Sequence, residues 1–258
     1  RAMEFIPSIL GPITGTTALL SVAAVFVAGF VRGFVGFGAA MIVIMALSIV
    51  LGPRSAVAVA SLAGVVTTLQ LLPVAVRMAD RPFVVPFGIA SFVAAPLGTL
   101  VLVTIDQALM KMAISLFVLF MVAMMWRGWR IGSGGPATVI GTGLAAGLIQ
   151  GSAGVGGPPA VALALARPGS APQQRANVIG AVASLAFCGI PALWYHGLFT
   201  KEVIVVSVLI VPPYVFSTWL GARFFSLQGQ HIFRAAALWV LAIAGVVTLV
   251  LAVRDYGA

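Results

Sequence analysis

The sequence predicts an all-α polytopic membrane protein that forms a single membrane domain over residues 1–258. Hydrophobic residues make up 62% of the chain and charged residues only 7%, a balance that suits lipid rather than water as the solvent. Apolar runs long enough to cross a bilayer recur along the chain, since a spanning helix needs about 20 such residues. A glycine motif that occurs twice also indicates an internal duplication.

The duplication is visible as the pattern G-x-x-x-G-x-x-G-x-G, which occupies residues 29–38 and again 147–156, at an offset of 147 − 29 = 118. A second block around Leu97-Gly98 resembles one around Leu220-Gly221. We therefore expect two repeats, over about 16–128 and about 136–253. Close helix packing is the other explanation of a G-x-x-x-G spacing.

Three long apolar runs follow the motif in each half and are expected to be full transmembrane helices. Glycine, proline and charged residues mark their ends, as in Gly52-Pro53-Arg54. Aromatic residues such as Trp126 and Trp194 suit the headgroup level of a bilayer. The predicted spans are 55–76, 82–104 and 107–126 in the first half, and 173–195, 202–222 and 232–252 in the second.

The glycine segments themselves are expected to be re-entrant or discontinuous helix pairs that turn near the middle of the membrane. Only nine apolar residues, 158–166, follow the second motif, and a helix of that length rises about 14 Å, half of the hydrocarbon core. Irregular backbone at that depth must be buried in protein or line a cavity.

Loop charges offer a second argument for this arrangement. With both glycine segments re-entrant, loop Lys and Arg divide eight against five, with both termini outside; with both spanning, they divide seven against six. The positive-inside rule favours the first split. Three spans per half would also make the two repeats inverted, as in many transporters.

Residues that could perform chemistry are few. All five carboxylates, Glu4, Asp80, Asp106, Glu202 and Asp255, fall at predicted loops or termini. Proton relays and membrane hydrolases need buried acids, histidines or metals, so the sequence predicts no enzyme, no metal site and no cofactor. The single cysteine, Cys188, is expected to be a small packing residue.

Arg32 is the predicted binding charge, because it lies beside the first glycine turn, where an arginine costs roughly 2.5–3.5 kcal/mol to insert. It could instead snorkel to the interface or pair with backbone carbonyls. Around it we expect the amides of Gly36, Gly38, Gly156 and Gly157, at the N-termini of returning half-helices that favour anions. Further predicted donors are Gln150, Ser152, Thr67, Thr68, Gln70 and Asn177.

The doubled motif, on an apolar chain of this length, resembles the TauE/SafE sulfite exporter family, also called the toluene sulfonate uptake permease family. The first copy departs from the second by having Ala39 and Ala40 where the second has Gly157 and Pro158. The resemblance implies transport of sulfite, a sulfonate, a sulfoacetate-like compound or another small organic anion. A multi-pass protein of the cell inner membrane is expected, working by alternating access.

The expected partners are the small anionic substrate, membrane lipids and, for assembly, a second copy of the chain. Nucleic acid is not expected, because the basic residues are scattered through loops and suit lipid headgroups better. Three alternatives stay open: a passive anion channel, a transporter of a small organic carboxylate, and a membrane enzyme acting on a lipid phosphate. Saturable flux with counterflow distinguishes a transporter from a channel, and phosphate release identifies the enzyme.

Overall fold

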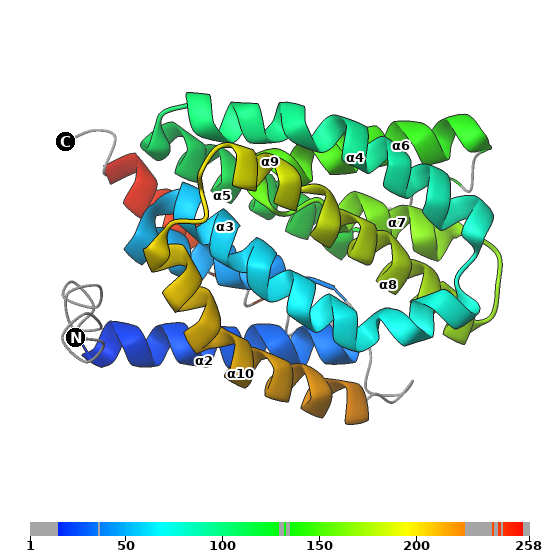
Figure 1. Cartoon of the computed structure of the whole chain (residues 1–258), viewed down its shortest axis with the longest axis horizontal. Coiled ribbons are helices and arrows are strands. Elements are labelled where there is room, and N and C mark those ends of the chain that lie inside the picture. Colours follow the sequence, from blue (N-terminus) through cyan, green and yellow to red (C-terminus); the bar gives the residue numbers. More distant parts are fainter. Residues whose placement is uncertain are drawn as a thin grey trace.

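A computed structural model describes residues 15–35, 37–128, 132, 135–224, 239, 242–243 and 245–254, and this part of the chain is helical, without strands (Figure 1). The helices lie roughly along one direction, as expected when apolar helices must all cross one bilayer. They are α2 (Gly15–Val35), α3 (Ala39–Met78), α4 (Arg81–Thr104), α5 (Gln107–Trp126), α6 (Pro136–Ala153), α7 (Gly157–Ala166), α8 (Ala171–Cys188), α9 (Ile190–Tyr195) and α10 (Lys201–Arg223).

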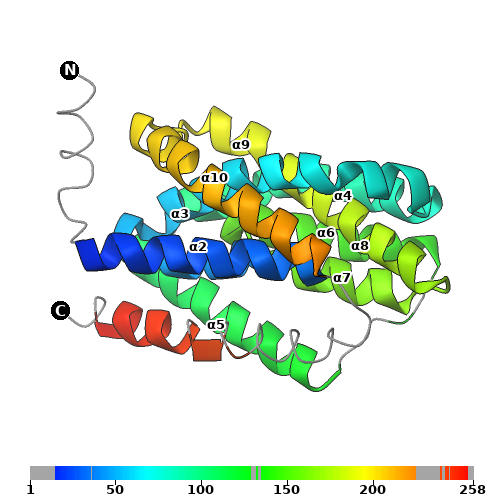
Figure 2. The ribbon, with the colours of Figure 1, turned by 90° about the horizontal axis from the view of Figure 1, so that it is seen from below.

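Five helical stretches of the described chain are long and apolar enough to cross a membrane: 39–73, 81–104, 107–124, 172–195 and 201–223. They confirm five of the six predicted spans as helices. The sixth, 232–252, lies partly outside the described residues; its described end belongs to the apolar helix Gly245–Arg254, which packs beside α5 (Figure 2). α5 and this segment also meet through an edge-on contact between Trp126 and Trp239.

Two of the spans contain breaks. α3 bends sharply at Gly52, whose φ of 77° and ψ of 163° leave the helical region, so that residues 39–51 and 53–78 form two segments. Glycine adopts a positive φ without the penalty that a side chain brings, and Pro53 can start the second segment. The span predicted over 173–195 is divided into α8 and α9 at Gly189.

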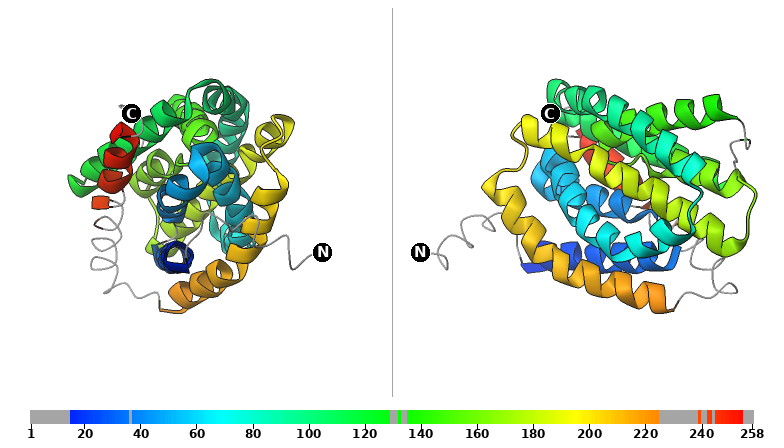
Figure 3. Two further views of the ribbon diagram at one scale, coloured as in Figure 1. Left: turned by 90° about the vertical axis from the view of Figure 1, so that its left-hand side faces the viewer. Right: turned by 45° about the vertical axis from the view of Figure 1, so that its right-hand side comes forward.

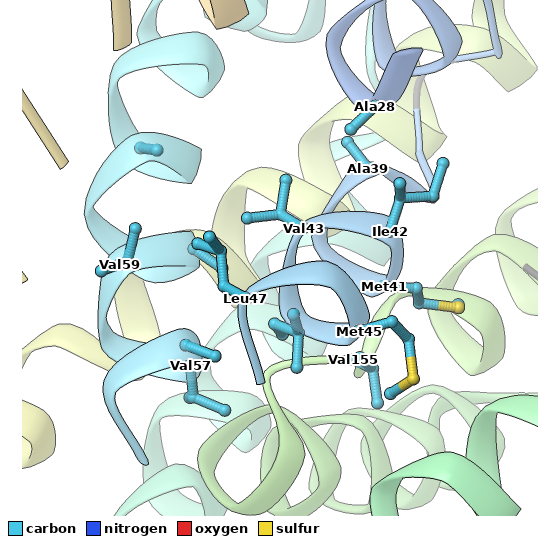
Figure 4. Close-up of a cluster of buried hydrophobic side chains, with 14 of the residues drawn as sticks. Ala28, Ala39, Met41, Ile42, Val43, Met45, Leu47, Val57, Val59 and Val155 are labelled. Atoms are coloured by element: carbon cyan, nitrogen blue, oxygen red, sulfur yellow. The ribbon is translucent and has the colours of Figure 1, made fainter. Parts of the chain in front are cut away.

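Each glycine segment forms a helical hairpin. In the first, α2 turns at Gly38 into the initial segment of α3, and Ala28 lies beside Ala39 and Ile42 (Figure 4). In the second, α7 folds back along α6. The long arms, of 21 residues in α2 and 18 in α6, rise about 31 and 27 Å, farther than the half of the hydrocarbon core that a turn near the middle of the membrane requires.

The two halves are joined by a reciprocal pairing of helices: α2 packs on α10, and α6 packs on α4 (Figures 1 and 2). Both contacts depend on glycine. A Cβ added at Gly33 would lie 1.9 Å from the Thr218 carbonyl oxygen, and one at Gly151 would lie 2.0 Å from that of Ala95. The first two glycines of each motif therefore let backbones approach closely, which is the packing explanation of the G-x-x-x-G spacing.

Candidate functional site

The two glycine turns meet at a cavity of about 50 Å³, several times the roughly 10–15 Å³ that one water needs. It has room for a few waters or one small oxyanion. α8 closes one side of it with apolar side chains. The lining residues are Arg32, Phe37, Gly38, Ala40, Met41, Ala60, Ser61, Gly64, Gln150, Gly154, Val155, Gly157, Val182, Leu185 and Ala186.

Arg32 supplies the positive charge of this cavity. It lies in the last turn of α2, where the helix dipole favours a cation, and its side chain is only 5% exposed. One guanidinium nitrogen donates to the Thr68 hydroxyl and to the Gly64 carbonyl oxygen, the latter over 3.5 Å. No carboxylate of the described residues pairs with it, and its Nε has no partner there. Burial leaves this charge uncompensated, which favours an anionic ligand.

The start of α3 adds directed donors. Gly38 caps this helix with a φ of 91° and no side-chain bond to the first turn. The first helical bond runs from the Ile42 amide to the Gly38 carbonyl, over 3.5 Å. The amides of Ala39, Ala40 and Met41 therefore lack partners within the helix. Ala40 and Met41 also line the cavity, so this helix end suits an anion.

The second turn is built differently. Its left-handed residue is Gly154, with a φ of 69°, and Val155 points toward Met41 and Met45 of α3 (Figure 4). The Gly156 amide, predicted as a ligand donor, instead donates to Gln150 Oε1 over 3.1 Å. Pro158 and Pro159 carry no N–H. The start of α7 consequently offers fewer donors than the start of α3.

Gly156 and Gly157 also differ in the space around them. A Cβ at Gly156 would lie 2.3 Å from the Ala146 carbonyl oxygen in α6, whereas one at Gly157 would meet nothing within 4 Å. Gly157 lines the cavity and Gly156 does not. Gly156 is thus required for folding α7 onto α6, and Gly157 leaves the cavity open.

Among the other predicted donors, Arg32, Gly38, Gln150 and Gly157 share the cavity, while Gly36 lies outside the described residues. The Thr67 hydroxyl is buried but donates to carbonyls of its own helix. Ser152 is half-buried, donates to the Ile149 carbonyl and does not line the cavity.

Two predicted donors lie away from the cavity. Gln70 is exposed, because it follows Thr68 by two residues and so projects about 200° around α3 from it. Asn177 accepts the Asp80 amide over 2.7 Å. Asp80 also pairs with Arg167 over 2.8 Å, so Asn177 belongs to a polar link between the α3–α4 and α7–α8 connections.

Sequence reasoning missed two residues near Arg32. Ser61 lines the cavity, and the Tyr214 hydroxyl of α10 interacts with Arg32 and Thr67. The spacing of Ser61, Gly64 and Thr68 places small and polar residues on one face of a helix, a signal present in the sequence. Tyr214 has no such signal, because its position depends on how α10 crosses the first half.

These features define a class: a polytopic α-helical membrane protein in which two glycine-broken hairpins enclose a buried cationic cavity. The family model of the sulfite exporter TauE/SafE matches residues 21–248, and the chain belongs to this family, whose members are membrane transporters. No curated protein and no solved structure matches the chain.

Proposed function

We propose that this protein carries a small sulfur-containing anion, such as sulfite, a sulfonate or a sulfoacetate-like compound, across the inner membrane by alternating access. The observation that carries the proposal is the buried guanidinium of Arg32, which lines a small cavity and whose Nε has no partner among the residues that the structure describes. Such a group is most stable with an anion beside it. Family membership supports the same class of substrate.

In the proposed site, the oxygens of the anion are held by Arg32 and by the amides at the start of α3 that have no partner within the helix. Gln150 contributes from the other half, where its Oε1 already fixes the Gly156 amide and its side-chain amide nitrogen is the remaining donor. Gly38 and Gly157 permit close approach of a ligand to the backbone. Ser61 is added to this set because its side chain borders the same cavity.

Alternating access and inverted repeats are part of the proposal. Supporting evidence comes from glycine contacts: Gly29 and Gly33 pack near Tyr214 and Thr218, and Gly147 and Gly151 pack near Ser91 and Ala95. Corresponding helices thus make corresponding contacts in the two halves, the relation that an internal two-fold axis produces. We also propose that the protein is a multi-pass protein of the inner membrane and that it assembles with a second copy of the chain.

Topology can be tested with single cysteines at Pro53 and Lys201, introduced after Cys188→Ala. If both hairpins are re-entrant, the two sites lie outside and react with an impermeant thiol reagent in intact cells. If both glycine segments span the membrane, the two sites lie on opposite sides. Labelling of only one of the pair would therefore contradict the inverted arrangement.

Transport is best tested in proteoliposomes, with sulfite, thiosulfate, short sulfonates and small carboxylates as substrates. A transporter of sulfur anions should show saturable flux and counterflow with a sulfur anion. Flux that rises linearly with concentration would indicate a channel instead, and preference for the carboxylates would assign the alternative substrate class.

The site itself is tested with Arg32→Gln, which keeps a donor and removes the charge. Anion affinity should fall by about 1.5–3 kcal/mol, the range for hydrogen bonds to charged groups, and Arg32→Lys should restore only part because it lacks the planar fork. Arg223→Gln removes an exposed arginine and serves as the control. If a folded Arg32→Gln protein binds the anion normally, the role of Arg32 is structural and the site assignment is wrong.

A further inference from the structure

A broad apolar groove of about 1030 Å³ lies apart from the Arg32 cavity. Ile190 and Pro191 of α9 form one wall, and Ile204, Val208 and Val211 of α10 form the other. Side chains of α3 form its floor. Its volume is at the upper end of the roughly 300–1,000 Å³ typical of small-molecule sites, which is far more than a small oxyanion requires.

The groove has no free hydrogen-bonding group among its lining side chains. Ser207 is the one lining residue with a polar side chain, and its hydroxyl donates to the Val203 carbonyl oxygen of the same helix over 2.6 Å. A polar ligand would lose its water here without gaining a partner. The lining therefore suits hydrocarbon and excludes the transported anion.

One end of the groove lies near a charged side chain and an aromatic side chain. Lys201, exposed at the first residue of α10, precedes Ile204 and Val208 by three and seven residues, so all three share one face of the helix. On the α9 side, Trp194 is not a lining residue, but it follows Ile190 and Pro191 by four and three residues and is 72% exposed. The loop between α9 and α10 joins the two walls at this end (Figure 3).

We propose that this groove binds an anionic phospholipid, with its acyl chain along Ile204, Val208 and Val211 and its phosphate beside Lys201. A cation above an apolar channel complements the charge order of such a lipid. Trp194 suits the same headgroup level. A second copy of the chain fits less well: copies in one membrane share orientation, so a symmetric contact would bring Lys201 of each copy to the same depth, where the like charges repel.

The experiment is native mass spectrometry of the full chain, released from detergent after incubation with phosphatidylglycerol or with phosphatidylcholine of the same acyl chains. Val208→Trp fills the groove. Leu209→Trp is the matched control, because Leu209 is the next residue, is 50% exposed and does not line the groove. Lys201→Glu reverses the charge at its end.

We expect one phosphatidylglycerol per chain to be retained by the parent and by Leu209→Trp, and to be lost from Val208→Trp. Lys201→Glu should lower the preference for phosphatidylglycerol by about fivefold or more, the effect expected of one basic side chain near an anionic headgroup. Equal retention by both tryptophan variants would overturn the proposal. So would an unchanged preference in Lys201→Glu, or a dimer that Val208→Trp dissociates, which would identify the groove as an interface between copies.

Discussion

The two halves share a glycine motif, yet their turns differ in what they offer a ligand. The first turn brings Arg32 to the cavity, together with amides at the start of α3 that have no partner within the helix. In the second turn, the Gly156 amide donates its hydrogen bond to the Gln150 side chain. Two prolines also remove donors from the start of α7. The glycines that pack helices are equivalent in the two halves, whereas the binding groups are not. The packing contacts are thus alike in the two halves, while the charge resides in one of them.

The largest expected effect tests the equivalence of the packing glycines. Gly33→Leu and Gly151→Leu should both prevent stable folding, because a Cβ at either position already meets backbone of the partner helix. The penalty should exceed the about 1–3 kcal/mol typical of overpacking, since backbone cannot move aside. Thermal unfolding in detergent measures it.

Gly141→Leu is the control for this pair, because Gly141 lies on α6 with nothing within 4 Å, and it should unfold like the parent. If Gly33→Leu folds normally while Gly151→Leu does not, the two interfaces are not equivalent and the comparison fails.

The next effect separates packing from binding within the second turn. Gly156→Ala should destabilise the protein by about 1–3 kcal/mol, because its Cβ clashes with the Ala146 carbonyl. Gly157→Ala should change stability by less than about 0.5 kcal/mol but weaken anion binding, since its methyl group enters the cavity. Thermal unfolding measures the stability of both variants, and anion titration measures their binding. Unaltered anion binding by Gly157→Ala would place the ligand elsewhere.

Substitutions at Gln150 separate the effect of charge beside the cavity from the effect of its hydrogen bond to Gly156. Gln150→Glu keeps an oxygen acceptor for the Gly156 amide but adds negative charge beside the cavity. Anion affinity should fall by at least roughly 1–2 kcal/mol, the Coulomb energy that two unit charges already have about 10 Å apart at an effective dielectric constant of about 20. Gln150→Leu should instead destabilise folding, because it leaves the Gly156 amide unpaired. Identical behaviour of the two variants would contradict this assignment.

The smallest effect is expected at the polar link outside the cavity. Asp80→Asn breaks an ion pair whose side chains are 20% and 25% exposed, and pairs in contact with solvent contribute at most about 1 kcal/mol. Flux should remain appreciable, as it should after neutralising Asp106 or Glu202. Complete loss of flux in a folded Asp80→Asn protein would reveal a functional acid.

The sequence predicted the spans well, because an apolar run of bilayer length has few alternatives to a helix. It also indicated the break at Gly52, where glycine precedes proline. Which motif glycine packs helices and which one forms a turn was harder to predict, because glycine is favoured both for close packing and for left-handed turns. Gln70 shows a further limit: proximity to Thr68 along the chain does not determine which face of α3 a side chain occupies.

The reciprocal pairing of α2 with α10 and of α6 with α4 has a mechanical consequence. A rigid motion that separated the two halves would have to break both glycine-lined interfaces at once. A motion that carries α2 together with α10, and α6 together with α4, would leave both intact. A rigid body that moves in the proposed transport cycle would therefore contain helices of both halves. For the same reason, one half made alone would expose a glycine groove shaped for a helix it does not have, and two such halves would be expected to exchange arms.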